Sequence, residues 1–504
     1  MKKLVAGLLT AVALLAMSAC GADQKNTAQT SSSTKESAEV SSGASEQAYT
    51  DPKEMKESYD IVIVGAGGAG MAAAIEAKDA GLNPVIFEKM PVAGGNTSKS
   101  SSGMNASETK FQKEEGIEDS NEAFYEETLK GGGGTNDKEM LRYFVDHSAD
   151  AIDWLDQNGI KLDNLTITGG MSEKRTHRPS DGSAIGGYLV DGLLNSVHER
   201  KIPIFVNTDV TDIKKNGETV NEVTVHVQGE EPKEITGKAI VVTTGGFGAS
   251  KEFIERYRPD LADYITTNQE GSTGDGITMI EKLGGQTVDM DKIQIHPTVQ
   301  QDEGILIGEV VRGEGAILVN QEGKRFVNEM DTRDKVSAAI TVLPEKSAYL
   351  IFDQGVRDRA TAIEFYDQKG YVTTGKTMEE LAEKIDLPKE TFAKTIDGWN
   401  ADVAKKKDAQ FNRATAMEHD LSSPNYYAIK IAPGIHYTMG GVKINTNTEV
   451  LDKENQPISG LYAAGEVTGG LHGDNRIGGN SVAEIIIFGR QAGIQAARFA
   501  SQNE

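Results

Sequence analysis

Residues 60–70 read Asp-Ile-Val-Ile-Val-Gly-Ala-Gly-Gly-Ala-Gly, and this stretch decides the fold of the chain. An apolar, β-branched run leads into a Gly-x-Gly-x-x-Gly turn, and an Ala-rich pattern from Met71 to Ala80 predicts a helix after it. In such a turn the first glycine allows the tight bend, the second lets a pyrophosphate approach the backbone, and the third lets helix and strand pack closely. The N–H groups and positive dipole end of the helix hold the phosphates. The expected phosphate-binding residues are Gly65, Gly67, Gly68, Ala69 and Gly70.

A second apolar run, Pro84–Phe87, ends in Glu88, where an acidic residue can hold a ribose hydroxyl. A glycine turn by itself often only closes a loop. A strand, a helix, a second strand and an acid in this order instead favour dinucleotide binding.

Two later strand patterns also end in glycine-rich loops. Residues 239–244 are followed by Gly-Gly-Phe-Gly at 245–248, and residues 460–466 read Gly-Leu-Tyr-Ala-Ala-Gly-Glu. Helical stretches, such as Asn136 to Asn158 and a last helix from about Val482 to Ala500, alternate with the strands. This alternation predicts an α/β fold around a largely parallel sheet.

Because the glycine-rich strand ends lie far apart in sequence, we expect a nucleotide domain that is split by an insertion. The best candidate for the insertion runs from about Lys292 to Ile435. It has strand patterns and amphipathic helix patterns of its own, at residues 316–320, 348–352, 378–385 and 389–400.

The composition narrows the classes of partner. The chain has 504 residues, a formal net charge of −24 and no long basic run. Nucleic acid is therefore not an expected partner, because phosphate binding needs clustered Lys and Arg. An anionic substrate is still compatible with an acidic protein if a local pocket reverses the sign.

The N-terminus has the pattern of an export signal. Lys2 and Lys3 precede an apolar run from Leu4 to Met17, which is too short for a transmembrane helix and is followed by Cys20. This resembles a bacterial lipoprotein signal at residues 1–19 with Cys20 as the lipidated residue, which predicts a lipid anchor in the cell membrane on the extracytoplasmic face. Ordinary secretion with an incidental cysteine is the alternative. Residues 20–57 are rich in Ser, Thr, Ala, Glu, Lys and Gln and are expected to be a disordered tether.

Cys20 is the one cysteine of the chain. It excludes intramolecular disulfides, thiolate-held iron–sulfur clusters and c-type haem attachment, so redox chemistry must rest on an organic cofactor, and no metal site is expected. Within the tether, Glu39–Ser45 is similar to the sequence to which a flavin transferase attaches FMN through a phosphoester. Ser45 is therefore a candidate for covalent FMN, although Ser-rich sequence also produces such matches by chance.

Five polar clusters lie in glycine- or threonine-rich sequence, at residues 294–298, 309–313, 328–335, 436–441 and 472–480. With Glu88–Pro91, Gly94–Thr97 and Asn268–Gly276, their order resembles the soluble FAD-dependent fumarate reductases, the flavoprotein part of the flavocytochrome c enzymes. These are related to the flavoprotein subunits of succinate dehydrogenase and fumarate reductase. The resemblance covers about residues 59–500 and includes no haem domain.

This resemblance implies a Rossmann-like FAD-binding domain, residues 58–291 and 436–504, that is split by an inserted α+β capping (clamp) domain, residues 292–435. Thr97 falls where the membrane-complex relatives carry the histidine that bonds FAD, so the FAD is expected to be non-covalent. Besides the phosphate loop, the residues expected to contact FAD are Glu88, Lys89, Gly95, Asn96, Thr97, Ser102, Gly103, Thr244, Gly245, Asp275, Glu466, His472, Gly479, Asn480 and Ser481.

The resemblance also assigns roles toward a small dicarboxylate substrate. Arg476 and His436 match residues that grip one carboxylate, and His296, in the same segment as Gln294, matches a binder of the other. Arg333 matches an unusual catalytic acid.

Protons reach Arg333 through Glu309 and Arg312 in this scheme. Simpler interpretations stay open: Asp331 and Asp334 could pair with Arg333, and Glu309 and Arg312 could be an ordinary helix pair.

Leu306 and Gly308 stand where the family's fumarate reductases usually carry Met and Thr. We therefore expect a more open or more apolar pocket wall, on which a substrate larger than fumarate becomes possible.

The leading hypothesis is a tethered extracytoplasmic flavoenzyme that reduces the C=C bond of fumarate to succinate. Alternatives are a reductase of another unsaturated carboxylate, of the methacrylate, urocanate or cinnamate type, a dehydrogenase working in reverse, and a non-catalytic flavin electron carrier. The electron donor is expected to be a quinol-linked flavoprotein, an extracellular flavin or a cytochrome.

Overall fold

A computed structural model describes residues 49–502 of the chain. The signal sequence, Cys20 and Ser45 therefore lie outside the described residues. In the described part, buried apolar side chains form two clusters. One contains residues up to Ile293 and again from Ile435 onward, and the other contains residues from Ile307 to Ile431. The boundaries at 292 and 435 stay predictions.

The first cluster surrounds an eight-stranded sheet in which β17 (Glu449–Leu451), β18 (Pro457–Ala463), β9 (Lys233–Val242), β1 (Ser58–Val64), β2 (Pro84–Phe87) and β6 (Ile204–Phe205) follow one another. The central pairs β1–β2, β1–β9, β9–β18 and β2–β6 are parallel. Ile61, Val62 and Ile63 have no exposed surface, which is why β1 reads as a continuous apolar run. The α/β fold with a largely parallel sheet is confirmed.

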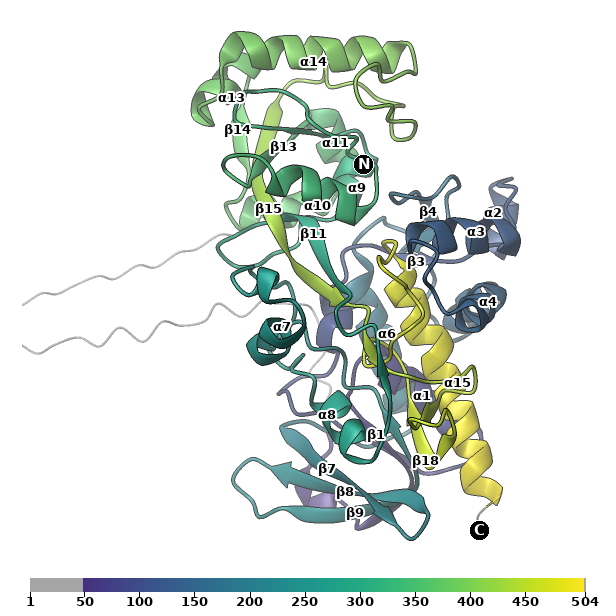
Figure 1. Cartoon of the computed structure of the whole chain (residues 1–504). Coiled ribbons are helices and arrows are strands. Elements are labelled where there is room, and N and C mark those ends of the chain that lie inside the picture. Colours follow the sequence, from purple (N-terminus) through teal and green to yellow (C-terminus); the bar gives the residue numbers. More distant parts are fainter. Residues whose placement is uncertain (1–48, 503–504) are drawn as a thin grey trace, which may run out of the picture. The chain divides into compact units, whose positions relative to one another are not determined.

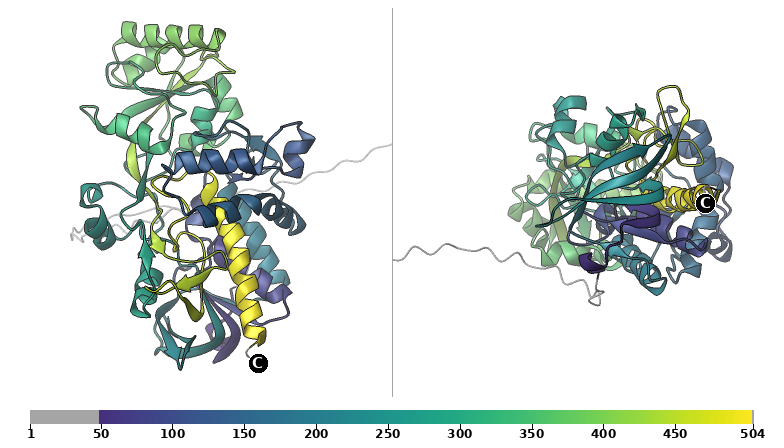
Figure 2. Two further views of the ribbon diagram at one scale, coloured as in Figure 1. Left: turned by 45° about the vertical axis from the view of Figure 1, so that its right-hand side comes forward. Right: turned by 90° about the horizontal axis from the view of Figure 1, so that it is seen from below.

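An antiparallel extension of this sheet is formed by β7 (Thr208–Asn216) and β8 (Thr219–Val227), which pairs with β9. Two helices pack together beside the parallel strands: α1 (Gly68–Asp79) directly after β1, and α15 (Asn480–Gln502) at the end of the chain. Figure 2 shows α15, in yellow, from two further sides. Gly493 makes this packing close, since a Cβ there would lie 2.3 Å from the Ala73 carbonyl oxygen.

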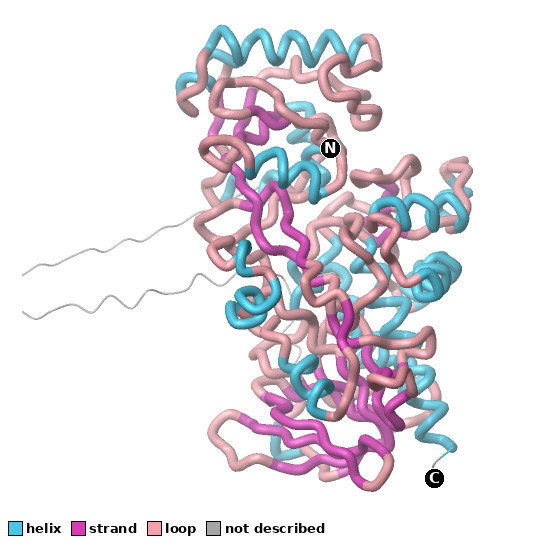
Figure 3. Tube along the Cα trace, viewed as in Figure 1, coloured by secondary structure: helices cyan, strands magenta, loops and turns pink. Residues whose placement is uncertain are grey.

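The second cluster surrounds a five-stranded sheet, in which β11 (Ile293–Val299), β15 (Tyr426–Thr438), β13 (Ala348–Asp353) and β12 (Ile317–Val319) are neighbours and β14 (Thr373–Gly375) also pairs with β15. The first half of β15 pairs with β13 and the second half pairs with β11. Since β11 and β15 reach back toward the main sheet, they carry the chain into and out of the insertion (Figures 1 and 3). Residues at their ends are therefore placed between the two cores.

The helices of the insertion are α9 (Glu309–Gly313), α10 (Arg333–Thr341), α11 (Gln354–Arg359), α12 (Ile363–Gln368), α13 (Met378–Lys384) and α14 (Lys389–Ala404). Elsewhere the structure has α2 (Lys110–Glu114), α3 (Asn121–Gly131), α4 (Lys138–Asp146), α5 (Ser148–Gln157), α6 (Ile185–Glu199), α7 (Lys251–Tyr257) and α8 (Asp275–Lys282). The remaining strands are β3 (Met104–Asn105), β4 (Asn164–Thr166), β5 (Thr176–Arg178), β10 (Thr287–Val288) and β16 (Gly441–Val442), with 3-10 turns at Pro52–Glu54, Gly95–Lys99 and Pro259–Leu261.

One predicted element differs from the structure. The helical stretch predicted from Asn136 to Asn158 is two helices, α4 and α5, which are separated at His147. The His147 Nδ1 atom lies 2.7 Å from the Tyr143 carbonyl oxygen, so the ring interacts with the last turn of α4. None of the helices among residues 49–502 is both long enough and apolar enough to span a membrane.

Candidate active site

The glycine turn after β1 presents unused hydrogen-bond donors. Within residues 49–502, no hydrogen bond uses the backbone N–H of Gly67 or of Ala69, whereas the N–H of Gly68 donates to Thr97 Oγ1 at 3.1 Å. A Cβ added at Gly67 would meet Thr97 Oγ1 alone, at 3.9 Å, and one at Gly95 would meet nothing within 4 Å. Free N–H groups beside open space at a helix N-terminus fit a pyrophosphate.

Glycine is required in this turn for two further reasons. Gly65 has a φ of +105°, and a Cβ there would lie 2.5 Å from the Thr243 carbonyl oxygen. A Cβ at Gly70 would lie 2.0 Å from the Gly65 carbonyl oxygen. The turn therefore tolerates no side chain at either position, as the sequence pattern predicts.

Glu88 lies at the end of β2, next to the glycine turn. Its carboxylate accepts hydrogen bonds from the backbone N–H groups of Ala66 and Met90, both at 2.9 Å. Burial raises the pKa of Glu88 above its usual range, against the effect of these N–H groups and of Lys89. Carboxylate oxygens have further lone pairs, so Glu88 is able to accept ribose hydroxyls as well.

Lys89, which follows Glu88, donates to Thr273 Oγ1 at 2.7 Å and forms an ion pair with Asp275. This pair brings together two of the residues predicted to contact the cofactor, from β2 and from the start of α8.

A second group of predicted cofactor residues surrounds Asn96. Its Nδ2 donates to Asn268 Oδ1 at 2.6 Å and to Glu466 Oε2 at 3.2 Å. Glu466 also accepts from the Thr438 N–H at 3.1 Å, and burial raises its pKa to about 7. Residues from three distant segments are therefore in contact.

Buried polar atoms without a partner lie at the same face of the fold. Among the described residues, Thr244 Oγ1 and Asn480 Nδ2 are buried and make no hydrogen bond. Asn480 begins α15, next to Ser481 and after Gly479, whose φ is +89°. Such atoms need a polar partner, and the edges of an isoalloxazine ring and a ribityl chain are partners of the right chemistry.

Four predicted cofactor residues have less direct placements. Ser102 accepts a backbone hydrogen bond from Ile185 through its carbonyl oxygen, and a Cβ at Gly103 would lie 2.4 Å from the His177 carbonyl oxygen. His472 Nε2 lies 2.9 Å from Glu484 Oε2, so one of its ring nitrogens is already engaged. Gly245 has a φ of +75°, and a Cβ there would meet Ser272 Oγ at 3.8 Å. Together the donor set of this face fits FAD.

The predicted substrate and acid residues meet at the junction of the two cores. Arg333, the first residue of α10, donates from Nε and Nη2 to the two carboxylate oxygens of Glu309, at 2.9 and 3.0 Å. Its Nη1 donates to Gln294 Oε1 at 3.0 Å. The same oxygen accepts from Arg476 Nη2 at 2.9 Å. Gln294, on β11, therefore joins the guanidinium groups of both arginines.

The alternative partners of Arg333 are not used in this part of the chain. Asp331 pairs with Lys335 at 2.9 Å, and no ion pair of Asp334 occurs among residues 49–502. The Glu309–Arg312 pair on α9 is long, at 3.5 Å, and Glu309 bonds Arg333 more closely. The main ion pair of Glu309 is therefore with Arg333 and not with its helix neighbour Arg312.

Glu309 is ionised in this environment. Burial opposes its charge, but the charge and hydrogen bonds of Arg333, together with Arg312 and Thr168, hold its pKa well below the usual range. Burial lowers the pKa of Arg312 and of Arg476 to about 10, with repulsion from Arg333 contributing to both. Both arginines remain charged at neutral pH.

The two histidines predicted to bind substrate face each other across this junction. The rings of His296 and His436 are 5.3 Å apart and meet edge to face. His436 Nδ1 lies 2.7 Å from Thr267 Oγ1, and His296 Nδ1 accepts from the Thr298 N–H at 3.2 Å. Burial, and then the nearby arginines, lowers the pKa of both rings well below the usual value, so both are neutral.

Three buried nitrogen atoms in this cluster have no partner in the described part of the chain: His296 Nε2, Arg476 Nε and Arg312 Nε. Arg476 also lies over the ring of Tyr437, with 4.3 Å between its Cζ atom and the ring centroid. An unsatisfied neutral imidazole and an unsatisfied guanidinium nitrogen are groups that bind carboxylate oxygens.

Sequence reasoning missed several contributors. Thr168 Oγ1 donates to Glu309 Oε2 at 2.9 Å, and Thr267 bonds His436. Tyr437 is adjacent to His436 in a quoted motif and could have been found there, but the two threonines carry no signal in the sequence.

The structure differs from the more open or more apolar pocket wall that the sequence predicts at Gly308. A Cβ at Gly308 would lie 3.1 Å from Ser101 Oγ and 3.5 Å from Tyr366 OH, which itself accepts from the Gly308 N–H at 3.0 Å. Hydroxyl groups from two other segments therefore occupy the space that a larger residue would take, and this wall is polar rather than apolar.

The raised pKa of Glu466 predicts a pH dependence of stability. Its folded pKa, about 7, exceeds its ordinary value of 4.5, so its contribution is fully present below pH 4.5 and is lost as the pH rises through 7. We expect Glu466→Gln to remove this loss, so that the unfolding free energy of the variant rises relative to that of the wild type by on the order of 3 kcal/mol as the pH increases.

The measurement is urea unfolding of the apoprotein at pH 5 and pH 8. The pH slope is the readout, because the new amide changes the hydrogen bonds to Asn96 at every pH. Equal slopes for the variant and the wild type would contradict an elevated pKa at this position.

Known proteins are similar to this chain in sequence and in structure. A family model described as FAD binding domain matches residues 60–482. The NADH:fumarate oxidoreductase of Klebsiella pneumoniae (strain 342) is 53% identical over 444 residues, which are 88% of this chain and 48% of that protein. The chain thus spans about half the length of that relative.

Two further relatives are covered more fully. The fumarate reductase (cytochrome) of Shewanella frigidimarina is 41% identical over 467 residues, 92% of this chain and 82% of that protein. A structure of the open conformation of a flavocytochrome c3 fumarate reductase superposes with a TM-score of 0.74 at 42% identity, covering 89% of this chain and 79% of that one. The Rossmann-like FAD-binding domain with a capping domain is thereby confirmed, and the chain belongs to the soluble FAD-dependent fumarate reductase family of oxidoreductases.

Proposed function

We propose that this protein reduces the C=C bond of fumarate to give succinate, with Arg333 as the proton donor. The observation that carries the proposal is the position of the Arg333 guanidinium. Glu309 binds two of its nitrogens, and the third shares Gln294 Oε1 with Arg476. A charged acid is thus fixed beside a carboxylate-binding arginine.

The two ends of a dicarboxylate are held by different groups in this proposal. Arg476 and His436 bind one carboxylate and His296 binds the other, which gives partners to Arg476 Nε and His296 Nε2. The arginines and Gln294 are buried in their present positions, so the alkene is held in one orientation. Hydrogen bonds to the carboxylates also stabilise the negative charge that develops on the substrate.

Bound FAD supplies the hydride. The residues of the chain supply the proton. Arg333 gives a guanidinium proton to the carbon next to the one that accepts the hydride, and this balances the addition of two electrons and two hydrogens. Glu309 then takes a proton from Arg312, whose Nη2 lies 3.5 Å from Glu309 Oε1, and passes it to Arg333, after which Arg312 regains a proton from solvent.

Arginine is a weak acid in water. Here the proton acceptor is a transient carbanion, for which a weak acid is sufficient. Because Arg333 is 5% exposed, its proton is also not exchanged freely with bulk water at the moment of transfer.

Replacement of Arg333 tests the acid. We expect Arg333→Gln to lower kcat for fumarate, in a reduced-dye assay, by at least the roughly 10²- to 10⁴-fold typical of general acids, with bound FAD retained. Arg357→Gln is the matched control, since Arg357 is an ion-paired arginine of the same domain that contacts Glu364 and Asp367 instead. Full activity of Arg333→Gln would exclude Arg333 as the acid.

Replacement of His296 tests the dicarboxylate. We expect His296→Ala to lower kcat/KM for fumarate by about 10- to 100-fold, the value of a hydrogen bond to a charged group, and to affect the monocarboxylate methacrylate much less. Equal losses for both substrates would show that His296 does not bind the second carboxylate. A protein that turns over none of fumarate, urocanate, methacrylate and cinnamate would be an electron carrier instead.

We also propose a lipid anchor on Cys20, an extracytoplasmic location, and FMN on Ser45. The sequence patterns at residues 1–20 and 39–45 support these assignments. The electron donor is then a quinol-linked or extracellular flavin partner at the membrane.

We expect Cys20→Ser to move the protein from the membrane fraction to the soluble fraction. We expect Ser45→Ala to lack FMN on the tether peptide, as measured by the mass of that peptide. Membrane retention of Cys20→Ser would contradict the anchor.

A further inference from the structure

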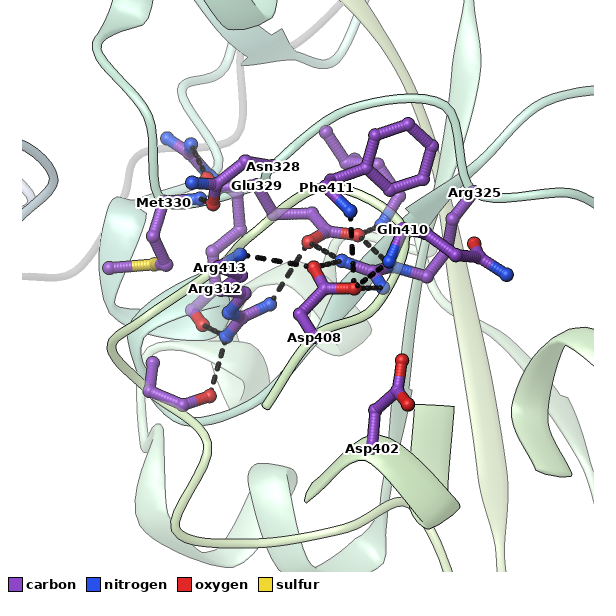
Figure 4. A network of polar contacts seen from close by, with 12 residues as sticks. Arg312, Arg325, Asn328, Glu329, Met330, Asp402, Asp408, Gln410, Phe411 and Arg413 are labelled. Carbon is purple, nitrogen blue, oxygen red and sulfur yellow. Dashed lines mark hydrogen bonds and ion pairs between the residues drawn. The ribbon is translucent and has the colours of Figure 1, made fainter. Parts of the chain in front are cut away.

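A second buried ionic cluster lies behind Arg312, away from Arg333. It consists of Arg325, Glu329, Asp408 and Arg413, which we call the support network (Figure 4). Arg325 binds the Glu329 carboxylate through Nε and Nη2, at 2.8 and 2.7 Å. It binds Asp408 through Nη1 and Nη2, at 3.0 and 2.9 Å.

Arg413 connects this network to Arg312. It donates from Nη1 to Glu329 Oε2 at 3.3 Å and from Nη2 to the Arg312 carbonyl oxygen at 2.8 Å. Arg312 in turn donates from its own Nη1 to the Glu329 carbonyl oxygen at 2.7 Å. The network thus holds Arg312 at both ends, at its main chain and at its guanidinium.

Among residues 49–502, the Glu329 carboxylate makes no hydrogen bond or ion pair with Arg312. It is used by Arg325, by Arg413 and by the Leu318 N–H at 3.2 Å, so Arg312 receives only the backbone carbonyl of Glu329. The two arginines and two acids of the network balance one another. Arg312 is therefore fixed in place without an ion pair to the Glu329 carboxylate. The acid that it faces is Glu309, at 3.5 Å.

A purely structural network would also be buried and bonded in this way, and Trp399 supports both arginines, with Cζ-to-centroid distances of 4.5 Å for Arg325 and 4.7 Å for Arg413. Buried ion pairs, however, are a poor source of stability compared with apolar side chains of similar volume. The connection to both ends of Arg312 is what a structural role does not require.

We propose that Arg413 and its partners Glu329, Arg325 and Asp408 are positioning residues, which fix Arg312 and withhold a carboxylate from it so that it can relay protons to Glu309 and Arg333. The inference rests on the proposed function, because it gives a purpose to the relay.

The test uses the FAD-loaded full chain with Arg413→Lys, which keeps the charge but cannot make the bonds to Glu329 and to the Arg312 carbonyl together. We expect kcat for fumarate to fall by about 10²-fold, as for a small misplacement of a reacting group. KM and FAD content change little. The solvent deuterium isotope effect on kcat increases, because proton delivery becomes slower than the other steps.

Arg359→Lys is the matched control. Arg359 binds the carboxylate and the carbonyl oxygen of Glu314, two residues after Arg312, but does not touch Arg312 itself. We expect its kcat and isotope effect to equal those of the wild type. Hydrogen exchange of the amides of residues 309–316 gives a readout apart from activity, and it should rise in Arg413→Lys.

The outcomes separate the two proposals. Wild-type protein that does not reduce fumarate would overturn the proposed function. If the wild type is active and Arg413→Lys behaves like Arg359→Lys, the positioning role is overturned. It is also overturned if Arg413→Lys loses kcat, bound FAD and thermal stability in parallel while its isotope effect is unchanged. If Arg413→Lys does not fold, Asp408→Asn takes its place. Failure of both to fold would assign the network to folding alone.

Discussion

The ion pair of Arg333 with Glu309 is the interaction on which the candidate active site depends. Three buried arginines, Arg312, Arg333 and Arg476, lie around this one carboxylate, and Arg333 repels both of the others. Burying like charges is unfavourable unless they are paired. Glu309 pairs with one arginine fully and with a second at long range, so an unbalanced positive charge remains at the junction of the two cores.

The groups that carry this excess positive charge are brought together by contacts between segments that are distant in sequence. Gln294 joins Arg333 to Arg476, which lies 182 residues away from it. Gly478 is packed so tightly against this group that a Cβ there would lie 2.1 Å from Glu309 Oε2 and 2.8 Å from Arg333 Nη2. The loop that leads into α15 is therefore in direct contact with α9 and α10. Any rearrangement of one domain against the other would alter the hydrogen bond between Gln294 and Arg476.

The parts of the fold that follow local rules could be predicted. Gly65 and Gly70 form the predicted tight turn and β2 has the predicted bounds, because the backbone of the turn and the apolar run of β2 follow local rules. Residues of the site such as Arg333 and His436 were found through their motifs. Their second contacts were not predictable: Thr168, Ser101 and Arg413 meet the site only through tertiary packing, across 141 residues in the case of Thr168 and Glu309. No periodicity or local motif records such a contact.

The positive charge at the site and the neutrality of the support network are connected. If the Glu329 carboxylate faced Arg312, the junction would lose part of its excess positive charge, and a dianionic ligand would gain less from entering it. Arg325 and Arg413 prevent this by occupying that carboxylate. The excess positive charge is unfavourable in the empty site and becomes favourable when two carboxylates enter. The site therefore prefers a dianionic ligand to water because of this change in electrostatic free energy, and not because of the contact area. Arg312, whose ion pair in the described part of the chain is the long one with Glu309, is then the group from which Glu309 can take a proton, because no second carboxylate competes for it.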